Sequence, residues 1–90
     1  MATVNFTVAP KDGTKAFKIE VDMKDVTVTN GKGTVTLDSG QHKLVWRFAG
    51  NPGSKLAIVG AVGSKKVVEV KQSTIPPGSP VGAGVKKFKV

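Results

Sequence analysis

The sequence predicts an all-β fold: one immunoglobulin-like β-sandwich of about 7–8 short, mainly antiparallel strands, with a small β-barrel as the alternative. Three observations lead to this fold class. Apolar and polar residues alternate in several segments, the apolar residues are chiefly valine, and 11 glycines with 5 prolines supply frequent chain reversals. Because 90 residues suffice for one domain and are too few for two, residues 1–90 are expected to form a single domain.

The N-terminal part of the chain is predicted to form two strands joined by a turn. Residues 3–9 alternate, and the side chains expected to point inward are Val4, Phe6 and Val8. The sequence PKDG at 10–13 predicts the turn, because proline suits an early turn position and glycine adopts a positive φ. Residues 15–23 alternate again, and the expected inward set is Phe17, Ile19, Val21 and Met23.

The strongest short-range signal is Asn30-Gly31, which lies between the runs DVTVT and TVTLD. An Asn-Gly pair between alternating valine and threonine residues predicts a tight hairpin turn. The residues expected to face inward around this turn are Val26, Val28, Val35 and Leu37.

The second half contains further strand signals. Residues 42–48 alternate, and the face that carries the only tryptophan is assigned to the core: His42, Leu44, Trp46 and Phe48. Residues 55–62 are continuously apolar, which favours a central strand covered on both sides. A strand at 65–72 follows directly, and STIPPGSPVGAG at 73–84 predicts a connection between two sheets. The closing strand, 85–90, points Phe88 and Val90 inward.

The motif Gly-x-x-Gly-Ser-Lys occurs at 50–55 and again at 60–65, which raises the question of a phosphate site. A P-loop needs wider glycine spacing, Lys before Ser or Thr, and a helix whose first N–H groups converge on the phosphates. Neither copy fits, and strand-like sequence follows both. Pro-Gly in the first copy suits a type II turn and Gly-Ser in the second a type II′ hairpin turn, so we interpret the motif as two turns.

The residues do not predict an enzyme, and no cofactor is implied. His42 is the only histidine, so no histidine cluster can bind a metal, and its place on the core face favours a partly buried structural role. The six carboxylates fall in turns or at outward strand positions such as Asp22, where nothing would separate their pKa values for acid–base catalysis. The serines lie in turns and loops without a nucleophile elbow.

The net charge of +8 resides in the second half of the chain, because residues 1–41 carry equal numbers of lysines and acids and residues 42–90 contain only Glu69 as an acid. This asymmetry indicates an anionic partner, either an acidic protein or an anionic polymer or surface, although it also serves solubility. The expected function is a non-catalytic binding, assembly or spacer module. The candidate partner-binding residues are Lys43, Arg47, Lys65, Lys71, Lys87 and Lys89.

Two alternative functions stay open. A self-assembling structural subunit would pair through the strand VKKFKV, although lysines on an edge strand usually block such pairing. Non-specific nucleic-acid binding would use the same cations, but single-strand binders also expose aromatic rings, and the alternation assigns the rings to the core.

The compartment is not determined by the sequence. The absence of cysteine slightly favours a reducing, cytoplasmic environment, with a periplasmic or surface domain as the alternative. The N-terminus lacks the basic and apolar regions of a signal peptide, and no run approaches the ~18 apolar residues of a membrane span.

The stretch VTLDSGQHKL follows a pattern of Gly-x-hydrophobic-x-Leu-x-x-Gly-x-His-x-Leu that begins at Gly33. With this pattern, the segment from Gly33 to Gly60 resembles PEGA-type modules, small β-sandwiches found as appendages in bacterial proteins. The resemblance covers about a third of the chain. It implies an interaction or spacer role and no active site.

Overall fold

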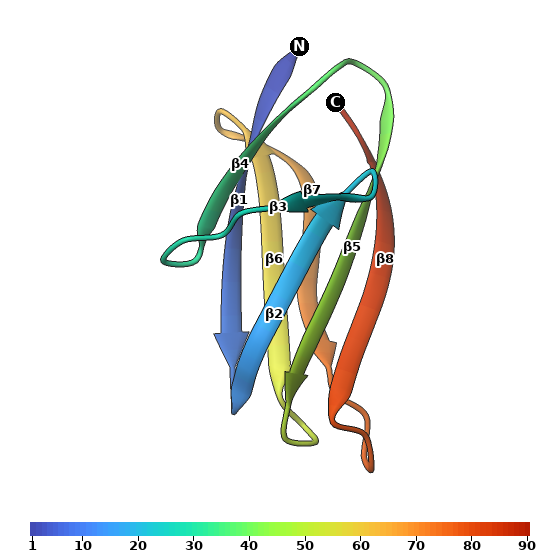
Figure 1. Cartoon of the computed structure of the whole chain (residues 1–90). Helices are drawn as coiled ribbons and strands as arrows, with labels where there is room; N and C mark the ends of the chain where they lie inside the picture. The colour runs from blue at the N-terminus through green and yellow to red at the C-terminus, as the bar shows by residue number, and fades with distance from the viewer.

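The computed structural model describes all 90 residues and contains eight strands and no helix. The strands are β1 (Ala2–Lys11), β2 (Thr14–Val21), β3 (Lys24–Val26), β4 (Lys32–Leu37), β5 (Gln41–Gly50), β6 (Lys55–Val62), β7 (Lys65–Thr74) and β8 (Val81–Lys89). They form two antiparallel sheets packed face to face (Figure 1): sheet A has the order β4-β1-β6-β7 and sheet B the order β3-β2-β5-β8. The predicted sandwich is confirmed, and because both sheets are open, the barrel alternative is wrong. The structure contains no helix that is long and apolar enough to cross a membrane.

The core lies between the sheets and is built from alternate residues of the strands, with Ile75 of the β7–β8 connection added. It contains 16 buried apolar side chains in one cluster. The central strands β1 and β5 supply six of them: Val4, Phe6, Val8, Leu44, Trp46 and Phe48. Phe88 of sheet B packs edge-on against Phe6 of sheet A, with ring centroids 6.4 Å apart. Since successive side chains point to opposite faces, the remaining residues of each strand form the outer faces of the sandwich.

Strands β1–β4 and strands β5–β8 share one pairing scheme. In the first half β1 pairs with β4 and β2 with β3, and in the second half β5 pairs with β8 and β6 with β7. The halves are joined by the pairs β1–β6 and β2–β5. Each half therefore contributes two strands to each sheet. This order differs from the ABED and CFG sheets of an immunoglobulin constant domain.

Both copies of the Gly-x-x-Gly-Ser-Lys motif form turns, as predicted. In the first copy the backbone N–H of Ser54 donates to the carbonyl of Asn51 (3.0 Å), and Gly53 has a φ of 89°. In the second copy Gly63 has a φ of 60° and closes the β6–β7 hairpin. These are the glycine conformations that type II and type II′ turns require.

The Asn30-Gly31 turn is also confirmed, but the strands beside it separate. Asn30 and Gly31 have φ values of 53° and 77°, and Thr29 and Lys32 exchange backbone hydrogen bonds of 2.8 and 3.1 Å. Beyond this single bridge β3 joins sheet B and β4 joins sheet A. The turn therefore carries the chain from one sheet to the other.

The inward orientation predicted for Met23 is wrong. Its side chain is 82% exposed, because Asp22 and Met23 have φ values of 51° and 69° and form the turn between β2 and β3. A two-residue turn with both φ values positive is the type I′ geometry of β-hairpins. The second strand consequently ends at Val21, two residues earlier than predicted.

The prediction of a connection over residues 73–84 is too long, because β7 continues to Thr74 and β8 begins at Val81. The two glycines at the start of β8 are strand residues whose missing side chains make room for aromatic rings. A Cβ atom at Gly84 would lie 2.2 Å from Cζ2 of Trp46, and one at Gly82 would lie 2.6 Å from Cε1 of Phe48. Glycine here reflects close packing within a strand and not a loop.

The prediction that residues 55–62 form a strand covered on both sides is half correct. The strand, β6, is central in sheet A, and its inward residues Leu56 and Ile58 are fully buried. Its outward residues, such as Ala57 and Val59, are half-buried, because no layer covers the outer face of sheet A. Gly60 lies where the β6–β7 register shifts, and a Cβ there would meet the Phe6 ring at 2.8 Å, so both a bulge and a close approach occur.

Candidate anion-binding surface

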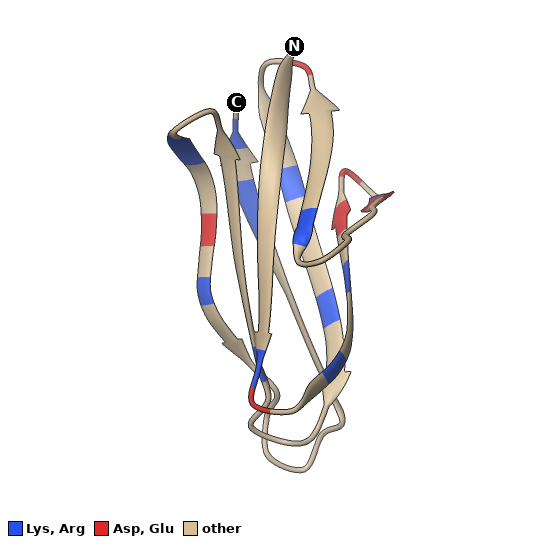
Figure 2. Cartoon of the chain, turned by 90° about the vertical axis from the view of Figure 1, so that its left-hand side faces the viewer, with Lys and Arg blue, Asp and Glu red and all other residues tan.

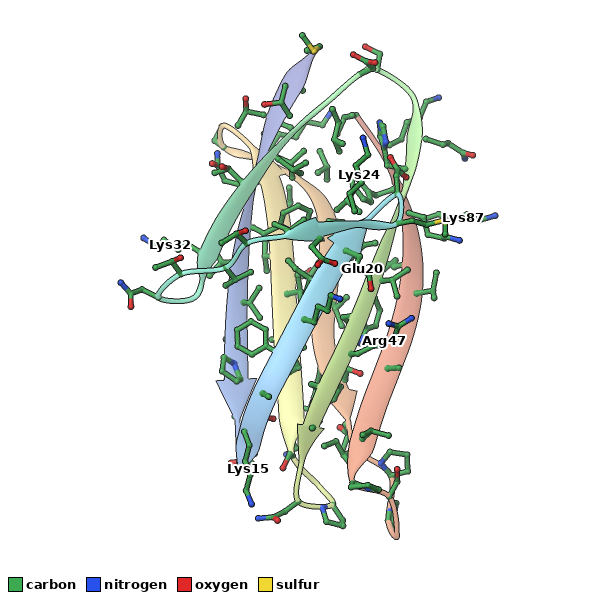
Figure 3. All side chains as sticks on the ribbon, viewed as in Figure 1. Lys15, Glu20, Lys24, Lys32, Arg47 and Lys87 are labelled. Carbon is green, nitrogen blue, oxygen red and sulfur yellow. The ribbon has the colours of Figure 1, made fainter.

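The outer face of sheet B gathers cations from β5 and β8. The two strands pair without a register shift, which places Lys43 opposite Lys87 and Gln41 opposite Lys89. Residues at alternate positions share a face, so all these side chains point away from the core. Figure 3 shows Lys87 projecting outward from β8 on the side away from Lys32.

The pair Lys43–Lys87 is electrostatically unfavourable in the free protein. Directly opposite residues in antiparallel strands have Cβ atoms about 4.5–5.5 Å apart, and like charges at such positions are destabilising. Neither lysine takes part in any of the five ion pairs of the structure. A bound anion between the two ammonium groups would remove this repulsion.

A further candidate, Lys65, meets Lys89 at the end of the sandwich where both chain termini lie (Figure 1). Lys65, at the start of β7, and Lys89, at the end of β8, line one hollow of about 410 Å³ together with apolar residues that include Val62 and Val90. Lys89 is thus common to the outer face of sheet B and to this hollow. We call Lys43, Lys65, Lys87 and Lys89 the basic band.

The remaining two candidates do not join the basic band. Arg47 lies on the same outer face but donates from Nη1 to Oε1 of Glu20 on β2 (3.4 Å), so part of its charge is balanced. Figure 3 shows the Arg47 and Glu20 side chains on neighbouring strands of this face. Lys71 lies on β7 in sheet A and is exposed. The structure therefore brings together four of the six predicted residues.

A hydrogen-bonded cluster around His42 borders the basic band. His42 Nδ1 lies 2.5 Å from Oδ2 of Asp22, and Nε2 lies 2.7 Å from the carbonyl oxygen of Asp38. The other carboxylate oxygen of Asp22 accepts from the backbone N–H of Lys43 (3.0 Å). The cluster ties the β2–β3 turn and the β4–β5 loop to the start of β5, where the basic band begins.

This cluster favours the charged form of both side chains. The hydrogen bond with Asp22, and after it the one with the carbonyl of Asp38, raises the pKa of His42 above its ordinary value of 6.5. The hydrogen bond from His42 lowers the pKa of Asp22 below its ordinary value of 3.8. An imidazolium donates from both nitrogens, so it satisfies both oxygen acceptors, whereas neutral histidine donates to only one.

The predicted outward strand position of Asp22 is wrong, and its partnership with His42 was not predicted. Asp22 lies in the β2–β3 turn, and its partner is 20 residues away in the sequence. Alternation predicts the correct face for His42, whose side chain is 12% exposed in the structure. Alternation does not identify Asp22 as its hydrogen-bond partner. The local sequence around Asp22, Asp-x-Lys, carries no signal that would have identified Asp22 as the partner of His42.

The distribution of charge at this site suits electrostatic binding of an anion. Both ring nitrogens of the only histidine already face oxygen atoms, and no group of three or more His, Asp or Glu side chains could hold a metal ion. Five of the six carboxylates form ion pairs, while the basic band has none. Figure 2 shows the acidic segments at turns and on other strands, with no acidic segment on the C-terminal strand.

Apolar residues continue this face beyond the charges. A shallow hollow of about 380 Å³ lies over β2, β5 and β8, and its outward residues include Ala16, Ala49 and Ala83. Val81 and Val85 on β8 are 55% and 60% exposed. The face thus has a cationic end and an apolar end, both of which include β8.

Comparison with known proteins provides no relative for this chain: no family model, no curated protein and no solved structure matches it.

Proposed function

We propose that this chain is a non-catalytic binding module whose basic band binds an acidic protein or an anionic polymer or surface. The observation that carries the proposal is the pair Lys43–Lys87, two like charges held face to face on adjacent strands with no carboxylate between them. The resemblance of the segment from Gly33 to Gly60 to PEGA-type appendages supports a binding or spacer role over an enzymatic one.

The energetics favour an anion at this position. A partner that supplies negative charge removes the repulsion between Lys43 and Lys87 and releases the counterions that screen them in the free protein. Binding of this kind weakens with the logarithm of the salt concentration. The attraction also accelerates encounter at low ionic strength, because the net charge is +8.

The proposal is tested with two variants of equal net charge. The first replaces Lys43, Lys87 and Lys89 by glutamine, and the second replaces Lys11, Lys15 and Lys32, which lie outside the basic band and in no ion pair. Figure 3 shows Lys15 and Lys32 far from Lys87. On heparin and polyglutamate columns, the first variant should elute at clearly lower salt than the second. If the two variants elute together, the basic band is not a binding site.

Self-assembly is the second candidate function, because β8 is a long edge strand with exposed apolar residues. Sedimentation over a range of concentrations separates it from the first: a monomer at high concentration argues against a subunit role. Nucleic-acid binding ranks below both, because the rings of Trp46, Phe48 and Phe88 are at least nine-tenths buried and Phe17 alone is half-buried, so no row of exposed rings is available on which bases could stack.

A further inference from the structure

The four edge strands of the sandwich differ in how well they are protected against pairing with another strand. In sheet B, β3 has only three residues, and in sheet A, β4 has six. Strand β7 has ten residues, but its pairing with β6 contains two register shifts, and Nζ of Lys86 donates to the carbonyl of Glu69 (2.7 Å). Short length, bulges and lysine side chains are known protections of sheet edges.

Strand β8 lacks these protections over its first half. It has nine residues, pairs with β5 without a register shift, and carries no charge from Val81 to Val85. Figure 1 shows β8 at the margin of sheet B with no other strand beyond it. A regular edge without charge is a template for an additional strand, whereas the lysines that follow favour a strand of opposite charge.

The register identifies which backbone groups of β8 are available. Gly40 and Val90 exchange both backbone hydrogen bonds (3.0 and 3.1 Å), and in an antiparallel pair such exchanges occur at every second position. The N–H and C=O groups of the intervening residues Ala83, Val85 and Lys87 therefore point away from β5. Those of Val81 are already bonded to the hydroxyl of Ser79. The free edge thus begins at Ala83.

The side chains along this edge indicate what kind of strand would fit. Val81 and Val85 present apolar surface on the outer face, and Lys87 and Lys89 follow on the same face. A strand beside β8 would place one half of its outward side chains next to the valines and the other half next to the lysines. Apolar residues suit the first half and carboxylates the second.

We propose that the acidic partner binds as an extended segment that adds to the free edge of β8 and extends sheet B. This proposal rests on the proposed function, because the same Lys87 and Lys89 hold the partner's carboxylates. The backbone groups of Ala83, Val85 and Lys87 supply the hydrogen bonds, and the charges select the partner. Binding by strand addition gains affinity from main-chain hydrogen bonds and specificity from alternate side chains.

A second copy of the chain fits this edge less well than an acidic segment. Each copy carries a net charge of +8, so two β8 strands approach against mutual repulsion within a Debye length of about 8 Å at physiological salt. An acidic segment reverses the sign of that interaction. Charge complementarity therefore favours a different, negatively charged chain.

The experiment uses the whole chain and a capped peptide of about eight residues, in which threonine alternates with valine in one half and with glutamate in the other. Hydrogen exchange followed by NMR measures the amides of Ala83, Val85 and Lys87 with and without peptide. The proposal expects these amides to slow at least about tenfold on saturation. It also expects a peptide with N-methyl groups on the residues that face β8 to bind about tenfold more weakly, because it cannot donate the hydrogen bonds.

A matched pair of variants tests the same edge from the side of the protein. Val85→Pro removes an N–H that points away from β5, and Val85→Thr keeps that N–H while making the side chain polar. The proline variant should bind the peptide about tenfold more weakly than the threonine variant. Trp46 fluorescence verifies folding, and if the proline variant does not fold, the exchange data and the methylated peptide still decide.

The outcomes separate this proposal from the function on which it rests. Lysine-dependent heparin binding without protection of the three amides would retain the basic band and overturn strand addition. If heparin binding does not depend on the lysines of the basic band, both the proposed function and strand addition are overturned. Protection of the amides that appears without peptide and rises with protein concentration would show that a second copy occupies the edge, and it would also overturn the proposal.

Discussion

The two halves of the molecule share one pairing scheme but differ at their edges. Strands β1–β4 end in edges of three and six residues and carry balanced charge, whereas β5–β8 end in edges of ten and nine residues and carry the whole net charge of +8. Long edge strands pair readily with other chains. The comparison indicates that the charge of the second half restrains non-specific association while it favours acidic partners.

The largest expected effect concerns the packing that holds the β8 edge in place. Gly84→Ala would put a Cβ atom 2.2 Å from Cζ2 of Trp46, so either the ring or β8 must move. Overpacking of this kind should lower the free energy of unfolding by about 3 kcal/mol. Urea unfolding followed by circular dichroism measures the change.

The neighbouring position provides the control for this prediction. Ala83 is exposed on the outer face, so Ala83→Val should change the free energy of unfolding by no more than about 0.5 kcal/mol. Equal stabilities for the two variants would show that β8 does not depend on close contact with Trp46.

The next effect concerns the cluster that joins the halves through Asp22 of the β2–β3 turn and His42 of β5. The raised pKa of His42 stabilises the fold fully below pH 6.5, and this contribution disappears as the pH rises through the higher folded pKa. The lowered pKa of Asp22 stabilises the fold fully above pH 3.8, and this contribution disappears as the pH falls through the lower folded pKa. The combined contribution is therefore complete between these two values.

Urea unfolding as a function of pH tests the cluster. The protein should lose about 1 kcal/mol between about pH 5 and about pH 9, the magnitude of a partly exposed ion pair. In His42→Gln this loss should be absent, because glutamine does not titrate. Asp38, Lys24 and Lys43 also face the cluster, and Lys43→Gln serves as the control that keeps the pH dependence. A variant without His42 that keeps the full loss would contradict the assignment.

The sequence predicts the core well and the surface site only in part. Alternation identifies Phe6, Trp46 and Phe88 as buried because its period of two depends only on the strand itself. The opposition of Lys43 and Lys87 depends on the pairing of β5 with β8, two strands that are separated by two others in the sequence. No local pattern specifies that register, so the six candidate cations could not be divided into a band and two outliers.

Turn geometry explains the remaining differences. Asn30-Gly31 and Pro52-Gly53 carry the residue types that their turns require, and both were predicted correctly. Asp22 and Met23 adopt positive φ values without a glycine, so the turn had no sequence signal and the partner of His42 stayed hidden. Gly82 and Gly84 led to the opposite error: they were assigned to a connection although they lie in strand β8. Glycine also occurs where aromatic rings approach the backbone.

The smallest expected effect distinguishes the two long edges of the second half. Lys86→Met removes the donor that covers the Glu69 carbonyl on β7, and Lys87→Met removes the same charge from the outer face without uncovering that carbonyl. Both variants should stay within about 1 kcal/mol of the parent in unfolding experiments, because the lost contacts are exposed. Lys86→Met should associate more strongly than Lys87→Met in sedimentation experiments at high concentration, since it removes the same charge and also frees an acceptor on a ten-residue edge. If both variants associate equally, loss of charge alone explains the effect, and β7 is protected by repulsion and not by the lysine contact.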